Sequence, residues 1–425
     1  MREGKKIAKG GDKALLKKIF QELLRKPKPY RRCEMRKLLV GLTVLGLLGL
    51  FCLPLGAEAL KGKVAVILDV GGRGDLSFND MGFKGTDEAA RDFGLEMIEV
   101  QSATAADYLP NVRNAARSGQ YDLIICVGFL LADALATVAP EFPEQKFAII
   151  DAVVDEPNVM SIIFAENEGS ALVGALAGMV AAHYGYRYVG CVLGIEIPVL
   201  YHFEAGFRFG IAWGLERYKE ITGKEANVGL LYTYTGTFSD IAKGKAATEA
   251  MLQQGAGLIY NVAGPLGIGD LEAITEYLHE QGKEAGPPFM IGVDANQDWM
   301  GDGHRVLASM MKRVDVGCYT AVKAVVEGTF KGGIYLMRLA NRGVAISRYQ
   351  DLLDFIEFGI NAGAITPADK ENIVKNWLEM RDAIPYFIWD AVSQLEMMIV
   401  SGEITVPTAN TLEEMEAVRA QYPLD

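Results

Sequence analysis

The chain has 425 residues, half of them hydrophobic, so it is long enough to bury the cores of two domains. Its charge is uneven: residues 1–34 hold twelve Lys or Arg against four acids, whereas residues 60–425 hold 28 against 49. A body with a net charge of −21 repels phosphate backbones and anionic lipid surfaces, which excludes nucleic acid as a partner.

The segment 35–59 has the pattern of an export signal. Met35-Arg36-Lys37 precedes the apolar run 38–55, which ends in Gly56-Ala57-Glu58-Ala59. A basic start, an apolar middle and small residues at the end predict a secretory signal peptide that is cleaved after Ala59. A single membrane anchor is the alternative, because a run of eighteen residues just spans a bilayer.

Two further expectations concern this end of the chain. Phe51 stands before Cys52, where a lipidation signal carries a small residue, so we expect no lipid anchor at Cys52 and a periplasmic protein free of the membrane. Residues 1–34 form a basic extension that a signal peptide does not need. We expect translation to start at Met35.

Apolar runs of strand length recur along the body, with helical patterns between most of them. They are Val64–Leu68, Leu95–Val100, Leu123–Val127, Phe147–Ile150, Val159–Phe164, Tyr188–Leu193, Val228–Tyr232, Leu258–Val262, Phe289–Val293 and Val306–Met311. Continuous apolarity predicts strands that are buried on both faces, as in a parallel sheet covered by helices. The sequence therefore predicts an α/β fold with two doubly wound parallel-sheet lobes and a site between them.

The alternation also predicts the limits of the lobes. We assign residues 60–165 and about 295–330 to the first lobe and residues 166–294 to the second. Residues 335–425 remain as a helical insertion and a C-terminal tail that pack on the lobes. The insertion contains three predicted helices between about 350 and 400, and a short strand is expected at Glu403–Val406.

Polar residues collect directly after the predicted strands, where open α/β sheets bind ligands. The richest stretch runs from Val70 to Gly85 and offers Asp75, Ser77 and Asn79, with Phe83 one turn further on. Its glycines lack the full spacing of a dinucleotide fingerprint, and Asp75 would repel a pyrophosphate. This stretch therefore favours a neutral ligand that is aromatic or rich in hydroxyl groups.

Other strand ends add four candidate ligand-binding residues. Asp151 and Asp294 follow strands, Gly264 lies in a turn where the backbone can approach a ligand closely, and Lys312 ends an apolar strand. A buried lysine requires an anionic partner, and we expect Asp294 to serve. The rival interpretation of Asp151 is a helix cap.

Signals of catalysis and metal binding are missing. The chain has no G-x-S-x-G elbow, no H-E-x-x-H pair and no phosphate-binding loop, so we expect neither an enzyme nor a cofactor. His202 lies in an aromatic stripe that core packing explains. Cys126, Cys191 and Cys318 are too few and too irregular for a disulfide framework or a metal site and are expected to be buried thiols.

Six segments, in this order, resemble the basic membrane protein (BMP) family, the substrate-binding proteins of ABC importers, many of which bind nucleosides. They are 75-DLSFNDMGFKG-85, 164-FAENEGSALVGALAG-178, 235-TGTFSDIAKGK-245, 263-AGPLGIG-269, 292-GVDANQ-297 and 309-SMMKRVD-315. The resemblance implies a type I periplasmic-binding-protein clamshell, a nucleoside or nucleobase as ligand, and an ABC permease at the inner membrane as partner.

The resemblance also implies roles for individual residues. The base would stack between Phe83 and Phe238, and Asp75 and Asn79 would face it. Asp294 and Lys312 would hold the ribose hydroxyls, with Asp151 near the base and Gly264 presenting backbone groups.

The sequence departs from the family pattern at the lipid-attachment motif, in the glycine-rich loop 70–76 and in the insertion near 340–395. The alternatives are a binding protein for a sugar or another small non-nucleoside ligand, a ligand-sensing partner of a membrane receptor, or an exported α/β enzyme.

Overall fold

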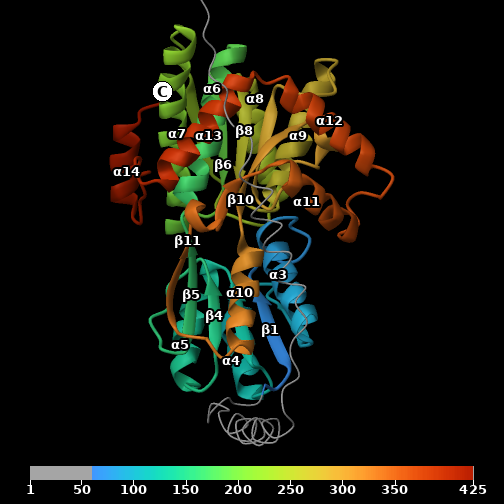
Figure 1. Ribbon diagram of the computed structural model, residues 1–425, viewed down its shortest axis with the longest axis vertical. Helices are drawn as coiled ribbons and strands as arrows, with labels where there is room; N and C mark the ends of the chain where they lie inside the picture. The colour runs from blue at the N-terminus through green and yellow to red at the C-terminus, as the bar shows by residue number, and fades with distance from the viewer. Residues whose placement is uncertain (1–59, 425) are drawn as a thin grey trace, which may run out of the picture. The chain divides into compact units, whose positions relative to one another are not determined.

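The computed structural model describes residues 60–424. The expectations for the basic extension, the signal peptide and Cys52 lie outside these residues. Two sheets of six strands each organise the described part of the chain, and each sheet forms the centre of one lobe (Figure 1). The fold class predicted from the apolar runs is confirmed.

The first sheet is parallel throughout. Its spatial order is β11 (Gly333–Met337), β5 (Val159–Phe164), β4 (Phe147–Ile150), β3 (Leu123–Val127), β1 (Lys63–Leu68) and β2 (Glu96–Gln101). Helices α3 (Phe78–Phe93) and α10 (Val314–Val326) cover one face, and α4 (Tyr108–Ser118) and α5 (Ala132–Val138) cover the other. Because helices bury both faces, the central strands are continuous apolar runs.

The second sheet has the same design with one antiparallel edge. Its order is β12 (Val344–Ile346), β10 (Val306–Lys312), β9 (Phe289–Asp294), β8 (Ala256–Val262), β6 (Tyr188–Leu193) and β7 (Gly229–Tyr234), with β12 antiparallel to β10. Helices α8 (Ile241–Gln253) and α9 (Leu266–Glu280) cover one face, and α6 (Glu166–Tyr184) lies on the other beneath α7 (Pro198–Thr222). Four more helices lie on this lobe: α11 (Tyr349–Asn361), α12 (Lys370–Asp382), α13 (Tyr386–Val400) and α14 (Leu412–Gln421).

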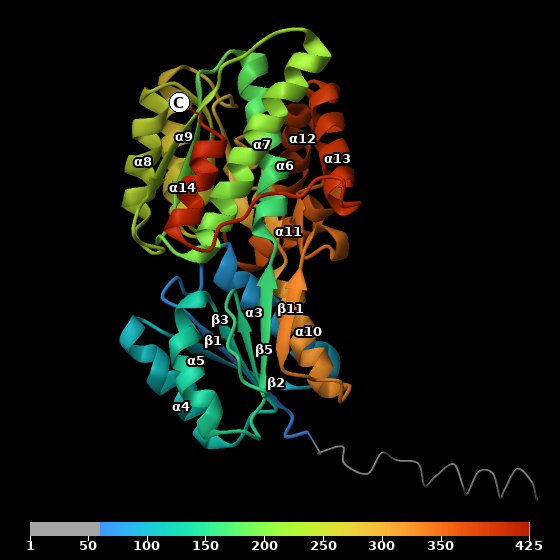
Figure 2. The ribbon, with the colours of Figure 1, turned by 90° about the vertical axis from the view of Figure 1, so that its left-hand side faces the viewer.

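Three short segments connect the lobes. One leads from β5 to α6, the second from β10 to α10 and the third from β11 to β12. Figure 2 shows β5 and β11 side by side as they approach the second lobe. Only one residue separates β5 from α6 and β10 from α10, so the residues at these junctions are fixed by both lobes.

The lobe limits predicted from the sequence need correction. Strand β10 pairs with β9, with one irregularity between Val306 and Ala308, so residues 295–312 belong to the second lobe and the chain returns to the first lobe only with α10. The third crossing was also missed, because β11 is a largely exposed edge strand and β12 has only three residues. The insertion contains the three expected helices.

Two predicted strands differ from the observed ones. Leu95–Val100 was expected to be buried on both faces, yet β2 is an edge strand with partly exposed side chains, because no further strand among residues 60–424 pairs with its outer side. Residues Glu403–Val406 form no strand and pair with no sheet, while the helix α14 that follows was not predicted.

Candidate functional site

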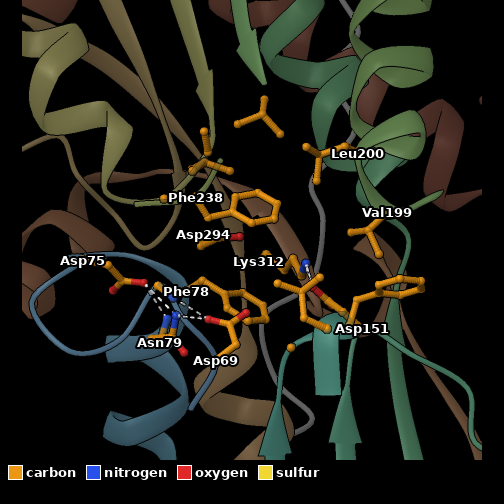
Figure 3. A pocket seen from close by; sticks show the side chains of 18 of the residues that line it. Asp69, Asp75, Phe78, Asn79, Asp151, Val199, Leu200, Phe238, Asp294 and Lys312 are labelled. Carbon is orange, nitrogen blue, oxygen red and sulfur yellow. Dashed lines mark hydrogen bonds and ion pairs between the residues drawn. The ribbon is translucent and has the colours of Figure 1, made fainter. Parts of the chain in front are cut away.

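A pocket lies where the carboxyl ends of strands from both sheets meet (Figure 3). Together with the solvent at its open side, it measures about 590 Å³. It is lined by Asp69, Gly71, Asp75, Phe78, Asn79, Gly128, Phe129, Leu130, Asp151, Ile197, Val199, Leu200, Phe203, Phe238, Val262, Ala263, Gly264, Pro265, Val293, Asp294 and Lys312. Seven of the nine sequence-predicted residues are among them; Ser77 and Phe83 are not.

Asp75 organises the start of α3. Its Oδ1 accepts hydrogen bonds from the backbone N–H of Ser77 (2.9 Å) and Asp80 (3.1 Å), and its Oδ2 accepts one from the N–H of Asn79 (2.8 Å). These amides belong to the unpaired donors at a helix N-terminus. Burial, with repulsion from Asp80, raises the pKa of Asp75 to about 7 despite these bonds. Asp75 therefore shapes the loop as well as lining the pocket.

Asn79 lines the pocket, and one atom of its side-chain amide has no partner in the described part of the chain. Its Nδ2 donates to Asp69 Oδ1 (2.9 Å) and to Asp75 Oδ2 (3.4 Å), which fixes the orientation of the amide. Its Oδ1 is buried and has no hydrogen-bond partner among residues 60–424. A buried acceptor without a partner costs free energy unless a ligand donates to it.

A charged cluster lies at the junction of the lobes. Lys312 Nζ contacts Asp151 Oδ2 at 2.5 Å and Glu166 Oε1 at 3.2 Å, and Glu166 Oε2 lies 3.1 Å from His202 Nδ1. The expected partner of Lys312, Asp294, is therefore not its ion-pair partner. The reason is tertiary: β4 and α6 bring Asp151 and Glu166 to the end of β10, and neither is near Lys312 in sequence.

Asp294 instead connects the lobes through a hydroxyl group. Ser77 Oγ lies 3.0 Å from Asp294 Oδ2 and 3.1 Å from the carbonyl oxygen of Val293. Ser77 is completely buried and stands just before α3 of the first lobe, while both acceptors end β9 of the second. Ser77 thus holds a ligand-pocket carboxylate without lining the pocket itself.

The protonation of the cluster follows from burial and charge. Burial opposes the charge of Lys312, but three nearby carboxylates outweigh it and raise the pKa of the ammonium group. Burial raises the pKa of Asp151 despite the attraction of Lys312. For Glu166 the attraction of Lys312 and His202 outweighs burial and lowers the pKa. The cluster therefore keeps a charged lysine, and Asp151 Oδ1 is buried without a hydrogen-bond partner in the described chain.

Two carboxylates of the pocket sit on unusual backbone. Asp151 and Asp294 have φ angles of 70° and 62°, in the left-handed region that non-glycine residues rarely adopt. Aspartate tolerates this region better than most residues, and such conformations gather at ligand sites. The strand ends are thus bent so that each carboxylate turns into the space between the lobes.

Four phenylalanines line the pocket, Phe78 and Phe129 from the first lobe and Phe203 and Phe238 from the second, and of these only Phe238 was predicted to bind the ligand. Phe238 extends from the segment after β7, where its ring packs against Gly194, and Phe78 begins α3 across the pocket (Figure 3). Phe83 lies elsewhere, with the guanidinium of Arg73 3.5 Å from its ring centre. Five residues along a helix turn a side chain by about 140°, which removes Phe83 from the face of Phe78.

Sequence reasoning missed Phe78, Glu166 and the apolar side of the pocket. Phe78 was within the quoted motif, and the rule that helix N-termini face the ligand could have selected it over Phe83. Glu166 also stood in a quoted motif, but no local signal connects it to Lys312. The apolar residues Val199, Leu200 and Phe203 belong to a stretch whose aromatic residues were assigned to the core.

Within residues 60–424, no helix is long and apolar enough to cross a membrane, and no group of three or more His, Cys, Asp or Glu side chains is arranged so that it could hold a metal ion. Cys126, Cys191 and Cys318 are buried and free, as predicted. Burial raises the pKa of the Cys126 thiol to about 12, so it is a packing residue and not a nucleophile.

Known proteins resemble the chain over most of its length. The family model of Bmp, ABC transporter substrate-binding protein PnrA-like, matches residues 62–358. An uncharacterized lipoprotein of Pyrococcus abyssi is 38% identical over 395 residues, covering 90% of this chain and 95% of the relative.

Two further relatives have more informative descriptions. The ABC transporter nucleoside-binding protein BmpA of Lactococcus lactis is 30% identical, with coverage of 72% and 89%. A crystal structure of an ABC transporter solute-binding protein from Aeropyrum pernix matches with a TM-score of 0.76 and 36% identity, covering 85% of this chain and all of the other.

Proposed function

Since the chain belongs to the Bmp family of PnrA-like ABC transporter substrate-binding proteins, we propose that the ligand it captures for its transporter is a nucleoside or a purine-like compound. The family is one of extracytoplasmic binding proteins and not of enzymes, which agrees with the lack of catalytic motifs. The observation that carries the proposal is the pair of rings, Phe78 and Phe238, that approach one pocket from opposite lobes.

A planar base fits between such rings. Stacking on an aromatic side chain contributes about 1–3 kcal/mol per base, so two rings supply a large part of micromolar or tighter binding. Asn79, Asp75 and Phe78 line the same pocket, and we propose that the amide oxygen of Asn79 and the carboxylate of Asp75 accept hydrogen bonds from the polar edge of the base. This retains the two residues expected to face the base and replaces Phe83 by Phe78.

The charged cluster suits the hydroxyl groups of a ribose. Asp151 Oδ1 has no hydrogen-bond partner in residues 60–424, and Asp294 and Lys312 line the same pocket. Hydrogen bonds to charged groups contribute about 1.5–3 kcal/mol each. Several buried carboxylates around a single lysine would repel phosphates, so we expect nucleosides and bases to bind in preference to nucleotides.

The description of one relative supports this ligand class, because BmpA of Lactococcus lactis is described as nucleoside-binding. We propose that this chain delivers its ligand to an ABC permease when the lobes enclose it. The segments that connect the lobes carry Glu166 and Lys312, so ligand contacts and lobe position would be linked.

The direct test is a thermal shift of the protein with adenosine, inosine, guanosine, cytidine, uridine, the free bases, the corresponding monophosphates and a set of sugars. A ligand that binds only the folded state raises the melting temperature by mass action. We expect shifts with nucleosides and weaker or no shifts with monophosphates. A shift with sugars alone would replace the nucleoside by the rival ligand class and leave the family assignment unchanged.

Membrane attachment is a second proposal, and it reverses the expectation that Cys52 carries no lipid. Three Pyrococcus relatives are described as lipoproteins. The alignment with the Pyrococcus abyssi protein covers 90% of the chain, which is more than residues 60–425 provide, so it extends into the apolar segment that contains Cys52. We propose that Cys52 is the lipid attachment point.

Expression of the full chain tests this attachment. Cys52→Ser should move the protein from the membrane fraction to the soluble fraction, and the mass of the natural protein should include a lipid. A mature protein that begins at Leu60 would contradict lipidation at Cys52 and restore the simple signal peptide.

A further inference from the structure

The insertion helices α11 and α12 contact the turn that follows β9. This turn, the 294–299 turn, begins with Asp294 of the pocket. Helix α11 lies at the end of the second lobe that faces the first (Figures 1 and 2). Lys84 of α3 in the first lobe places its Nζ 5.8 Å from the ring centre of Phe355 in α11. The insertion therefore lies beside the cleft, not on a remote surface.

The 294–299 turn contacts both lobes through Gln297. Its Nε2 donates to the carbonyl oxygen of Leu76 in the first lobe (3.1 Å), and its Oε1 accepts from the N–H of Val293 in the second (3.0 Å). Leu76 immediately precedes Ser77, whose hydroxyl contacts Asp294. Two adjacent residues of the first lobe are thus joined to one short turn of the second.

Asp298 anchors this turn to the insertion. Its side chain is fully buried, and its Oδ1 accepts from Ser309 Oγ (2.7 Å). Its Oδ2 accepts from Ser347 Oγ (2.8 Å) and from the indole N–H of Trp377 in α12 (2.9 Å). Arg381 Nη1, also from α12, lies 3.6 Å from the same oxygen and supplies the opposing charge.

Ser309 continues the connection toward the pocket. Its Oγ also accepts from the N–H of Gln297 (2.9 Å), and it stands three residues before Lys312 on β10. Close packing supports the same turn, because a Cβ at Gly359 of α11 would lie 3.1 Å from the ring of Trp299. Both insertion helices therefore pack against the turn, and neither lines the pocket.

We propose that Trp377 and Arg381 are positioning residues for ligand binding, which act through Asp298 to hold Asp294 and Gln297 in place. The inference builds on the proposed function, since it concerns the same pocket, and it gives the insertion a role. A buried carboxylate held by several donors has few alternative positions, so α12 fixes the 294–299 turn before the ligand arrives. This lowers the ordering cost that would otherwise reduce affinity.

The test uses Trp377→Phe, which keeps the aromatic ring and removes the indole N–H donor. Trp213→Phe is the matched control: Trp213 is partly buried in helix α7, and in the described residues no hydrogen bond joins it to the 294–299 turn or to α12. Amide hydrogen exchange is measured on the ligand-free full chain, followed by mass spectrometry of peptides from the 294–299 turn and from α6. Binding of inosine is measured by calorimetry.

We expect exchange in the 294–299 turn to be about tenfold faster in Trp377→Phe, with exchange in α6 unchanged, because a hydrogen bond to a buried charge is lost locally. Inosine affinity should fall by a similar factor, and Trp213→Phe should match the natural protein in exchange of the 294–299 turn and in inosine affinity. Unchanged exchange in Trp377→Phe, or equal loosening of the turn in Trp213→Phe, would overturn the proposal.

A second variant and the exchange measurement cover the cases in which Trp377→Phe does not fold or inosine does not bind. Ser347→Ala removes a smaller donor to the same oxygen of Asp298 and carries the same expectation if Trp377→Phe does not fold. If inosine does not bind the natural protein, that result counts against the nucleoside proposal, while the exchange measurement still decides whether α12 positions the turn.

Discussion

The first lobe lines the pocket with four polar side chains beside three apolar ones, whereas the second lobe lines it mainly with apolar ones. The polar wall of the first lobe has Asp69, Asp75, Asn79 and Asp151, beside Phe78, Phe129 and Leu130. The apolar wall of the second lobe has Ile197, Val199, Leu200, Phe203, Phe238, Val262, Ala263, Pro265 and Val293, beside Asp294 and Lys312. Both walls stand at the ends of sheets with nearly the same strand order. The difference therefore comes from the connecting segments, which shows that the fold places the site and the loops define its chemistry.

The two walls have different physical roles. The polar wall offers fixed acceptors, two of which have no hydrogen-bond partner among the described residues, and so it would orient a ligand. The apolar wall removes ligand surface from water and supplies binding free energy. Lys312, on the second lobe, contacts Asp151 on the first, and the hydrogen bond between Ser77 and Asp294 joins the same two walls.

Removing the charge of Lys312 should have the largest effect on the free energy of unfolding, because the ion pair of Lys312 with Asp151 joins the two walls. Lys312→Met leaves buried carboxylates without their cation, and such a loss costs about 3–5 kcal/mol of unfolding free energy. Urea unfolding followed by tryptophan fluorescence measures it. Lys323→Met, at a half-exposed ion pair with Glu327, is the control and should change stability by less than about 1 kcal/mol. Equal stability of both variants would show that the cluster is not essential.

Truncating one ring from each wall should weaken binding without a loss of fold. Phe78→Ala and Phe238→Ala each remove a stacking surface, so we expect about a 5- to 150-fold lower nucleoside affinity, corresponding to 1–3 kcal/mol. Calorimetric titration with inosine or the best nucleoside of the panel measures the change. Unchanged affinity in either variant would mean that the ligand does not lie between the rings.

The free energy of unfolding should depend on pH through Asp75 of the polar wall. Asp75 keeps its proton to about pH 7 when folded, whereas an unfolded aspartate loses it near pH 4. The folded chain binds more protons between these values, so the contribution of Asp75 to stability falls as pH rises. Relative to the natural protein, Asp75→Asn should gain about 1.4 kcal/mol per pH unit in this range.

Unfolding by urea at pH 5 and pH 7 measures this gain. Asp270→Asn is the matched control, since burial raises the pKa of Asp270 to about 7 but this residue does not line the pocket. It should show the same trend in stability and leave ligand affinity unchanged. Parallel stability curves for Asp75→Asn and the natural protein would contradict the raised pKa.

The smallest effect is expected at Phe83, which belongs to neither wall. Phe83→Ala should leave nucleoside affinity within about 0.5 kcal/mol of the natural value, because its ring packs under Arg73 outside the pocket. The same titration as for Phe78→Ala provides the comparison. A loss of affinity as large as that of Phe78→Ala would favour the pairing of Phe83 with Phe238 that the family resemblance implied.

Part of the polar wall and of the charged cluster could be predicted from the sequence. Asp75, Asn79, Asp151 and Asp294 were selected because they follow buried strands, and they line the pocket for that reason. The partner of Lys312 was chosen wrongly, since the choice between carboxylates at neighbouring strand ends depends on how the two sheets face each other.

The sequence by itself determined the two α/β units, the acidic body and the collection of polar groups at strand ends. It could do so because a strand buried on both faces must be a continuous apolar run, and a charge cannot stay inside such a run without a partner.

Tertiary structure alone decided that Lys312 meets Asp151, a residue 161 positions away, that Phe78 and not Phe83 faces Phe238, and that α12 anchors Asp298. The physical reason is that these contacts depend on the relative placement of separate elements. Burial periodicity fixes which face of an element is covered, but it carries no information on which distant element covers it.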